Sequence, residues 1–135
     1  MSADLCWSIV RKNSCFLVKS LGKTLTKEPN NLSGVNNFAS NGYINKKTVG
    51  VDADPSGKGV VLSIRKSKNG NKPAKSVSRT TVRGSRHSIK VIRDTLNKSE
   101  YRKDLSDIAI RRASAIIRSQ NTSAAKKQRS RRKKN

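Results

Sequence analysis

Histidine, cysteine and aromatic residues are scarce in this chain of 135 residues, which has one histidine, two cysteines and five aromatic side chains. His87, Cys6 and Cys15 cannot supply the four Cys or His ligands of a structural zinc site, so we expect no metal. The cysteines form no CxxC motif, and we expect two partly buried, reduced thiols. So few aromatic rings also argue against a stacking platform of the type that binds single-stranded nucleic acid.

Acidic residues are few as well. Eight Asp and Glu compare with 31 Lys and Arg, which leaves a net charge of +23. The carboxylates are scattered, and neither they nor His87 form a pattern that favours acid–base or nucleophilic catalysis. The glycines at 57–59 and 69–71 do not match the phosphate-binding GxxxxGK[ST] motif. We therefore expect no enzymatic activity, no cofactor and no small-molecule substrate.

Long apolar runs are absent too. No segment approaches the ~20 apolar residues of a membrane-spanning helix. Near the N-terminus, Arg11, Lys12 and Asn13 interrupt the apolar residues, which is not typical of a secretion signal. We therefore expect a soluble, intracellular protein without membrane contact. The apolar fraction of 33% allows one modest core, within the first ~120 residues.

The positive charge that is present lies mainly in the second part of the chain. Residues 1–58 contain eight basic and four acidic side chains, whereas residues 59–135 contain 23 basic and four acidic ones. An excess of this size destabilises a compact chain by self-repulsion unless a polyanion neutralises it. The sequence thus predicts a nucleic-acid partner, with the first part as scaffold and the second as contact surface.

Turn residues and alternating apolar residues predict several strands. Val49 and Val51 alternate with polar or small residues, as do Val60, Leu62 and Ile64, so one face of a sheet is apolar. From the N-terminus we expect, in order, a short helix over Asp4–Val10, strands over 15–20 and 23–28 around a turn at Leu21-Gly22, an irregular loop over 28–42, a hairpin of strands 48–53 and 59–66, a basic loop over 66–75, and a strand over 77–84.

Two helices are expected to close the domain, over Ser88–Lys98 and Asp104–Gln120. In the second, Asp104 is a suitable N-cap. One arc of this helix is apolar and contains Leu105, Ile108, Ala109, Ala113, Ile116 and Ile117. Strands followed by helices favour an α+β domain over residues 1–120. The basic C-terminal extension, 121–135, cannot bury enough apolar surface to order itself, and we expect it to be disordered on its own.

Opposite the apolar arc lie arginines, whose planar guanidinium groups bind phosphate oxygens with two hydrogen bonds. The basic tail equally fits a nuclear import signal, and both interpretations can hold together. Roughly 8 phosphate contacts would weaken binding ~10³–10⁵-fold between about 50 and 200 mM salt. Composition alone does not separate RNA from DNA. The candidate RNA contacts are Arg11, Lys12, Lys46, Lys47, Arg65, Lys66, Lys68, Lys72, Lys75, Arg79, Arg83, Arg86, Arg111, Arg112, Arg118, Lys126, Lys127, Arg129, Arg131, Arg132, Lys133 and Lys134.

Six segments carry a resemblance to a known family: MSADLCWSIVRKNSCFLVK, TKEPNNL, NGYINKKTVGV, GKGVVLSIRK, RTTV and AIRRASAIIRSQ. In register over about residues 1–120, they resemble the eukaryote-specific large-subunit ribosomal protein twenty-eight family. The resemblance implies a small mixed domain bound to ribosomal RNA beside neighbouring ribosomal proteins, in cytoplasmic ribosomes, after transit through nucleus and nucleolus for assembly. It implies that Trp7 and Phe16 anchor the core, and that the matching basic positions contact RNA or pack beside it, namely Arg11, Lys46, Lys47, Arg65, Lys66, Arg79, Arg111, Arg112 and Arg118.

The chain departs from that family pattern at two places. Lys103 stands where the family usually has proline, so we expect the start of the last helix to be less rigidly set. Ala39 and Ser40 stand where the family tends to have a basic and an aromatic residue, which weakens the case for an RNA contact at that loop. Two other classes stay open: a nucleolar ribosome-biogenesis factor with the same domain, and a chromatin or DNA architectural protein.

Overall fold

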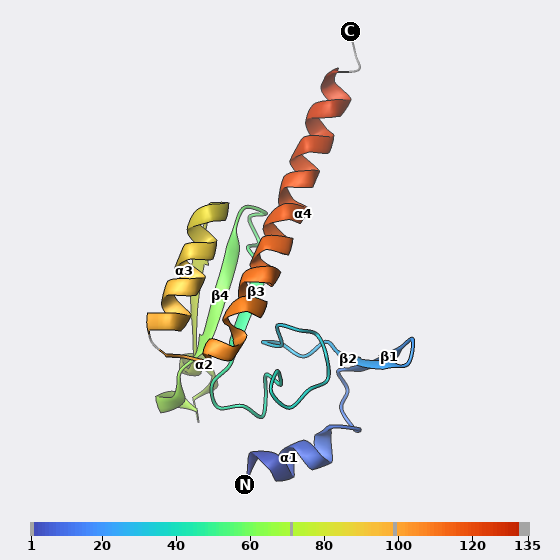
Figure 1. The fold of residues 1–135 in the computed structure, drawn as a ribbon, viewed down its shortest axis with the longest axis vertical. Coiled ribbons are helices and arrows are strands. Elements are labelled where there is room, and N and C mark those ends of the chain that lie inside the picture. The colour runs from blue at the N-terminus through green and yellow to red at the C-terminus, as the bar shows by residue number, and fades with distance from the viewer. Residues whose placement is uncertain (1, 71, 99, 133–135) are drawn as a thin grey trace.

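A computed structural model describes residues 2–70, 72–98 and 100–132, with all their side chains except those of Pro73 and residues 122–132. The elements in chain order are α1 (Ala3–Val10), β1 (Leu17–Ser20), β2 (Lys23–Thr26), β3 (Val49–Ala53), β4 (Val60–Arg65), η1 (Ser67–Asn69), α2 (Pro73–Ser76), β5 (Val77–Val82), α3 (Ser85–Lys98), η2 (Lys103–Leu105) and α4 (Ser106–Arg132). Two antiparallel sheets, β1-β2 and β3-β4-β5, confirm the predicted α+β class (Figure 1).

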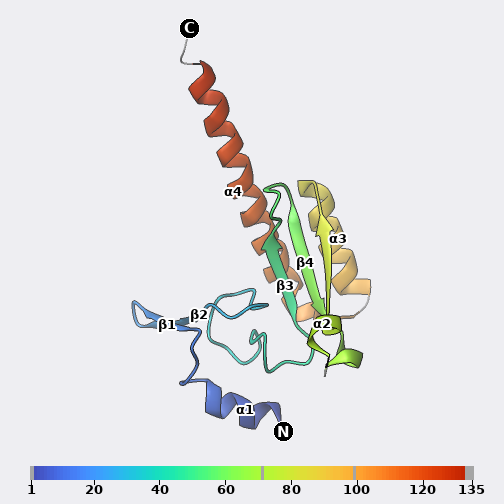
Figure 2. The same cartoon turned by 180° about the vertical axis from the view of Figure 1, so that it is seen from behind.

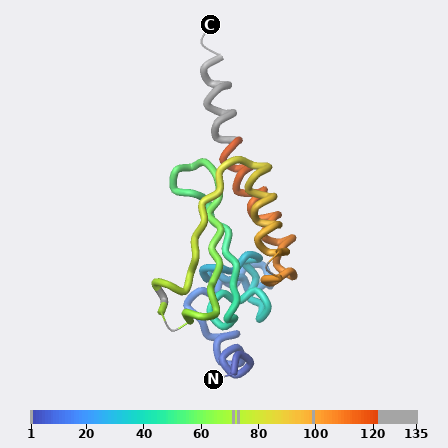
Figure 3. The backbone as a smooth tube through the Cα atoms, turned by 90° about the vertical axis from the view of Figure 1, so that its left-hand side faces the viewer, coloured from blue at the N-terminus to red at the C-terminus, as the bar shows by residue number. Residues whose placement is uncertain are grey.

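The larger sheet forms one layer and α3 and α4 form the other (Figure 3). Val51 pairs with Leu62, and Val60 pairs with Val82, so these apolar residues of the three strands share the face toward the helices. The buried cluster joins strand residues to helix residues: Val49, Val51, Val60, Leu62, Ile92, Leu96, Leu105, Ala109, Ala113 and Ile117. The fully buried Ala109 and Ala113 let α4 lie close to the sheet, because their side chains are small.

The last helix has the predicted apolar arc but different ends. It begins at Ser106, after the 3-10 turn η2, and it continues to Arg132, past the expected end at Gln120. Asp104 is therefore not its N-cap; its carboxylate accepts hydrogen bonds from Arg102 instead. Of the extension expected to be disordered, 121–135, residues 121–132 belong to α4 and residues 133–135 lie outside the described residues. The disorder of this extension on its own stays a prediction.

The side chain of Gln120 holds α4 against the turn between β3 and β4. Its Nε2 donates to the carbonyl of Gly59 and its Oε1 accepts from the Gly59 amide, both at 2.9 Å. Gly59 has a φ of +110°, and a Cβ there would lie 2.5 Å from the Val82 carbonyl oxygen. Only glycine fits between the two neighbours in this conformation.

Other boundaries differ modestly from the predictions. The helix expected from Ser88 begins at Ser85, and the buried Ser88 hydroxyl donates to the Gly84 carbonyl at 2.7 Å. The predicted basic loop after β4 contains two short helical turns, η1 and α2. The hairpin at Leu21-Gly22 is confirmed; both residues have positive φ, as a type I′ turn requires.

The expectation that Trp7 and Phe16 anchor the core is wrong. Both are half-buried, and neither belongs to the buried cluster. Trp7 contacts Phe38, with ring centroids 5.9 Å apart, and Phe16 stacks on Tyr43 at 5.5 Å. These pairs attach the N-terminal segment to the loop between β2 and β3, at the end of the sheet opposite to the end of α4 (Figure 2).

That loop, over residues 27–48, is organised by one buried carboxylate. Glu28 is 8% exposed and accepts hydrogen bonds from the side-chain amides of Asn31 at 2.7 Å and Asn41 at 2.9 Å. Asn41 in turn accepts from the backbone amides of Tyr43 and Ile44. Side-chain hydrogen bonds thus take the place of a regular backbone ladder and satisfy the buried side chains of Glu28, Asn31 and Asn41.

We expect Glu28→Gln to lower the free energy of unfolding by about 1–3 kcal/mol. The two oxygens of Glu28 accept from different donors, and a glutamine keeps only one acceptor oxygen, so one buried donor loses its partner. Urea denaturation followed by circular dichroism measures the effect. Glu100→Gln is the matched control, because the Glu100 side chain is 79% exposed; its effect should stay within about 0.5 kcal/mol. Equal stability of both variants would contradict an organising role for Glu28.

Candidate nucleic-acid interface

The predicted RNA-contact residues with described side chains are all exposed except Arg65 and Arg112, which are half-buried. Exposure is what phosphate contact requires, because long basic side chains reach a backbone only from the surface. The remaining candidates have side chains outside the described part of the chain: Lys126, Lys127, Arg129, Arg131, Arg132, Lys133 and Lys134. Their role in RNA contact stays a prediction.

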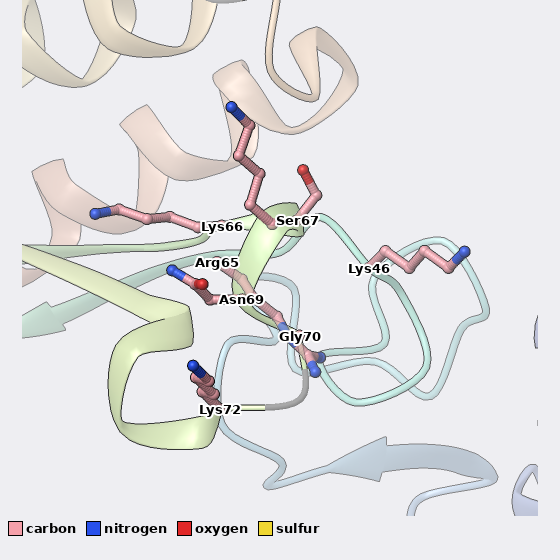
Figure 4. Close-up of a pocket in the computed structure, with 8 residues that line it drawn as sticks. Lys46, Arg65, Lys66, Ser67, Asn69, Gly70 and Lys72 are labelled. Atoms are coloured by element: carbon pink, nitrogen blue, oxygen red, sulfur yellow. The ribbon is translucent and has the colours of Figure 1, made fainter.

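Five of these cations line one surface pocket of about 570 Å³. They come from separate elements: the loop before β3, the end of β4, η1, and the residue before α2 (Figure 4). The basic residues that line the pocket are Lys46, Arg65, Lys66, Lys68 and Lys72. The other lining residues are Ser67, Asn69 and Gly70. No acidic residue lines this pocket, so its positive potential is not neutralised from within.

Hydrogen bonds fix the backbone around this pocket. The Arg65 amide donates to the Thr48 carbonyl at 3.1 Å, and the Lys66 amide donates to the Ser76 carbonyl at 2.6 Å. The hydroxyl of Tyr101 donates to the Arg65 carbonyl. Burial raises the pKa of the Tyr101 hydroxyl above its ordinary value. The end of β4 is thereby held in place before any ligand arrives.

Two pairs of candidate arginines, Arg65 with Arg79 and Arg111 with Arg118, lie on opposite sides of the molecule. Arg79 pairs with Ser63 across β4 and β5, a register that places both on the sheet face away from the helices, as it does Arg65. Arg111 and Arg118 lie on the exposed side of α4, opposite the residues that pack on the sheet. The two layers separate these groups (Figure 3). The structure therefore offers two cationic surfaces.

Arg112 belongs to neither surface. Its Nε donates to the Val51 carbonyl at 2.8 Å, its Nη1 donates to the Leu32 carbonyl at 3.4 Å, and its Nη2 lies 3.6 Å from an Asp52 oxygen. This guanidinium binds the outer edge of β3 and the loop in front of it. Of the two roles that the resemblance allows for this position, the contacts favour packing.

Arg102 is a structural residue that the sequence analysis missed. Its φ of +51° is left-handed, and its guanidinium donates to the carbonyls of Ala39 at 2.6 Å and Lys47 at 3.2 Å. It also binds Asp104 at 2.8 Å, and this hydrogen bond is the main cause that lowers the pKa of the Asp104 carboxyl. The start of α4, which Lys103 was expected to loosen, is anchored by the preceding arginine.

The sequence is similar to those of known proteins over most of its length. Residues 5–119 match the model of the Ribosomal L28e protein family. The chain belongs to this family. It is 40% identical over 126 residues to the large ribosomal subunit protein eL28 of Schizosaccharomyces pombe, which covers 89% of this chain and 93% of the relative. It is 36% identical over 122 residues to eL28 of Caenorhabditis elegans, covering 89% and 91%, and 33% identical over 135 residues to eL28 of Trypanosoma cruzi, covering 96% and 88%.

The family match includes the elements that build both cationic surfaces. It spans the pocket beside β4, the anchors Arg102 and Arg112, and the exposed arginines of α4. It ends at residue 119, so the basic tail lies beyond it. The resemblance inferred from the segments, above all AIRRASAIIRSQ, is confirmed at the level of the family.

The described residues hold no group of three His, Cys, Asp or Glu side chains that is suited to a metal ion. Within the same residues, no helix is long and apolar enough to cross a membrane. His87 is exposed in the first turn of α3. Cys6 is half-buried and no disulfide joins it to Cys15, as expected, but Cys15 is exposed, contrary to the expectation.

Arg111 and Arg112 are neighbours with different partners, and their alanine variants form a matched pair. We expect Arg112→Ala to lower the free energy of unfolding by about 1–3 kcal/mol, because the buried Val51 carbonyl loses its donor. Arg111→Ala should change it by less than about 0.5 kcal/mol. Thermal and urea unfolding of both variants measure the difference. Equal effects of the two substitutions would contradict the assignment of Arg112 to packing.

Proposed function

We propose that this chain is a structural constituent of the large subunit of eukaryotic cytoplasmic ribosomes and binds ribosomal RNA through phosphate contacts. The pocket of Lys46, Arg65, Lys66, Lys68 and Lys72 carries the proposal, because five cations without an acid require an external polyanion. The net charge of +23 points the same way. The ribosomal family supplies the class of polyanion.

The names and lengths of the relatives favour a subunit constituent over a biogenesis factor. The relatives from S. pombe, C. elegans and T. cruzi are each named a large ribosomal subunit protein, and the match covers 88% or more of each of them. A chromatin protein is supported by charge alone. Sedimentation separates the three: a constituent stays with large subunits in polysomes, a biogenesis factor with precursors, and a chromatin protein with neither.

The two cationic surfaces fit a position between RNA elements. A protein with RNA on one side alone would leave either Arg65 and Arg79 or Arg111 and Arg118 without phosphate partners. RNA on both sides neutralises both groups and removes the self-repulsion of the free chain. Exposed Leu5 and Ile9 of α1, at 53% and 60%, are suited to contact with neighbouring ribosomal proteins.

The basic tail extends the same function. Five of its seven basic residues, from Lys126 to Arg132, belong to the last turns of α4, and the tail would add phosphate contacts at the end of the helix, without base-specific readout. The same cluster is suited to nuclear import, which assembly of a large subunit in the nucleolus requires. We therefore propose transit through nucleus and nucleolus before the chain reaches cytoplasmic ribosomes.

We expect the double variant Arg111→Glu, Arg118→Glu to fold normally and to enter large subunits less efficiently. The substitutions lie on the exposed side of α4, away from the core, and each lost phosphate contact should reduce the slope of log affinity against log salt by roughly 0.7–0.9. Sucrose-gradient sedimentation of tagged protein, with salt washes of the particles, measures incorporation and salt resistance.

Lys19→Glu with Lys23→Glu is the control for this test. It makes the same change in net charge on exposed positions of the β1–β2 hairpin, which belong to neither cationic surface. The control should enter subunits nearly as well as the unmodified chain. Normal incorporation of the α4 variant with unchanged salt resistance would reject an RNA-facing role for that side of the helix.

A further inference from the structure

Tyr43 is an exposed aromatic residue whose ring packs on a second ring, that of Phe16. The residue is 54% exposed, yet its ring stacks on Phe16 with an interplanar angle of 20°. An aromatic ring half in water leaves apolar area that a ligand could bury. A flat π-face of this kind is the surface on which nucleic-acid bases stack, with little dependence on base identity.

The ring is also fixed from its backbone. The Tyr43 amide donates to the Asn41 Oδ1 at 2.9 Å, and the Asn41 amide group donates to the buried Glu28 at 2.9 Å. Phe16, which lies 27 positions earlier in the chain, holds the ring itself. Tyr43 is therefore held in place before binding, and a ligand that stacks on it loses little free energy in ordering the loop.

The cationic pocket adjoins this ring. The guanidinium of Arg65, one of the pocket residues, donates from Nη1 to the Tyr43 carbonyl at 3.4 Å. Lys46, three residues after Tyr43, lines the pocket from the same loop, and Figure 4 shows it across from Lys66 and Lys72. The residue that carries the ring thus contacts a residue of the cationic pocket through its backbone carbonyl.

The geometry points to a binding site for an unpaired RNA nucleotide, whose base stacks on Tyr43 while the adjoining phosphates enter the pocket. This inference rests on the proposed function of binding RNA. Paired bases are covered by their neighbours in the helix, so only a base outside the stack offers its face to the ring. An apolar protein segment suits the site poorly, because it would remove five cations from water without supplying an anion.

The test compares two RNA hairpins, one with a bulged adenosine and one identical but for the bulge. Fluorescence anisotropy measures the affinity of the full chain for each, over a range of salt concentrations. The unmodified chain should prefer the bulged hairpin. Tyr43→Leu should weaken binding to the bulged hairpin roughly 5- to 150-fold, the range for one stacked base, and leave the other hairpin within about twofold. Its salt slope should not change, because no charge is lost.

Two further variants complete the design. Tyr43→Phe keeps the ring and should bind as the unmodified chain does. Lys66→Ala with Lys68→Ala should weaken binding to both hairpins and reduce the salt slope, because these are phosphate contacts. Circular dichroism and urea unfolding check that each variant folds.

Four outcomes would overturn the inference. An unmodified chain without preference for the bulge, or a Tyr43→Leu variant that binds both hairpins normally, removes the stacking site but leaves the proposed RNA binding intact. An equal loss on both hairpins assigns Tyr43 to the fold. If Tyr43→Leu binds RNA normally but enters large subunits poorly, the ring contacts a neighbouring protein and not an RNA base. Failure of the unmodified chain to bind either hairpin in dilute salt instead rejects the proposed function itself.

Discussion

Guanidinium groups bound to backbone carbonyl oxygens hold the parts of this protein together. Arg102 joins the loop before β3 to the start of α4, Arg112 joins α4 to the edge of β3, and Arg65 joins β4 to the same loop. Eight acids cannot pair with 31 basic side chains, so carbonyl oxygens serve as further acceptors, beside Asp104 for Arg102 and Asp52 for Arg112. Hydrogen bonds to neutral carbonyl groups stabilise the fold but leave the positive net charge unchanged, so the folded chain still favours binding to a polyanion.

Sequence periodicity predicted the elements whose side chains repeat along one face. The arc of Leu105, Ala109 and Ala113 packs on the sheet as expected, and the alternation of Val60 and Leu62 gave the correct face of β4. These predictions succeeded because each depends on spacing within one element. The helix ends were less accurate, since Asp104 and Gln120 look like suitable boundaries, but Asp104 binds the nearby Arg102 and Gln120 binds the distant Gly59.

The site could be predicted only as a set of basic residue types. Exposure of Arg79 and Arg111 followed from their positions in a strand and a helix, but the gathering of Lys46 with Lys72 depends on how the loops fold. The β1–β2 hairpin and most of the loop that follows it separate Phe16 from Tyr43 in the sequence. No local pattern therefore predicts that their rings stack. The scarcity of aromatic residues, used against a stacking platform, excludes an extended one and says nothing of a single ring.

The pocket and the ring depend on a loop that has no regular secondary structure. Glu28 organises this loop from inside, and the contacts of Arg102 with its backbone fix it to the helical layer. Any change that loosens the loop therefore alters both stability and the proposed RNA contacts. We expect substitutions on the exposed side of α4 to affect the proposed contacts alone, which makes the two surfaces separable by experiment.

The clasp between Gln120 and Gly59 has a geometric consequence for the end of the chain. The glutamine amide fixes the rotation of α4 about its own axis at the point where the helix leaves the sheet. With a rise of about 1.5 Å per residue, the 12 residues from Asn121 to Arg132 reach about 18 Å farther. The contact of Gln120 with Gly59 thus sets the direction in which the C-terminal part of α4 extends from the folded domain.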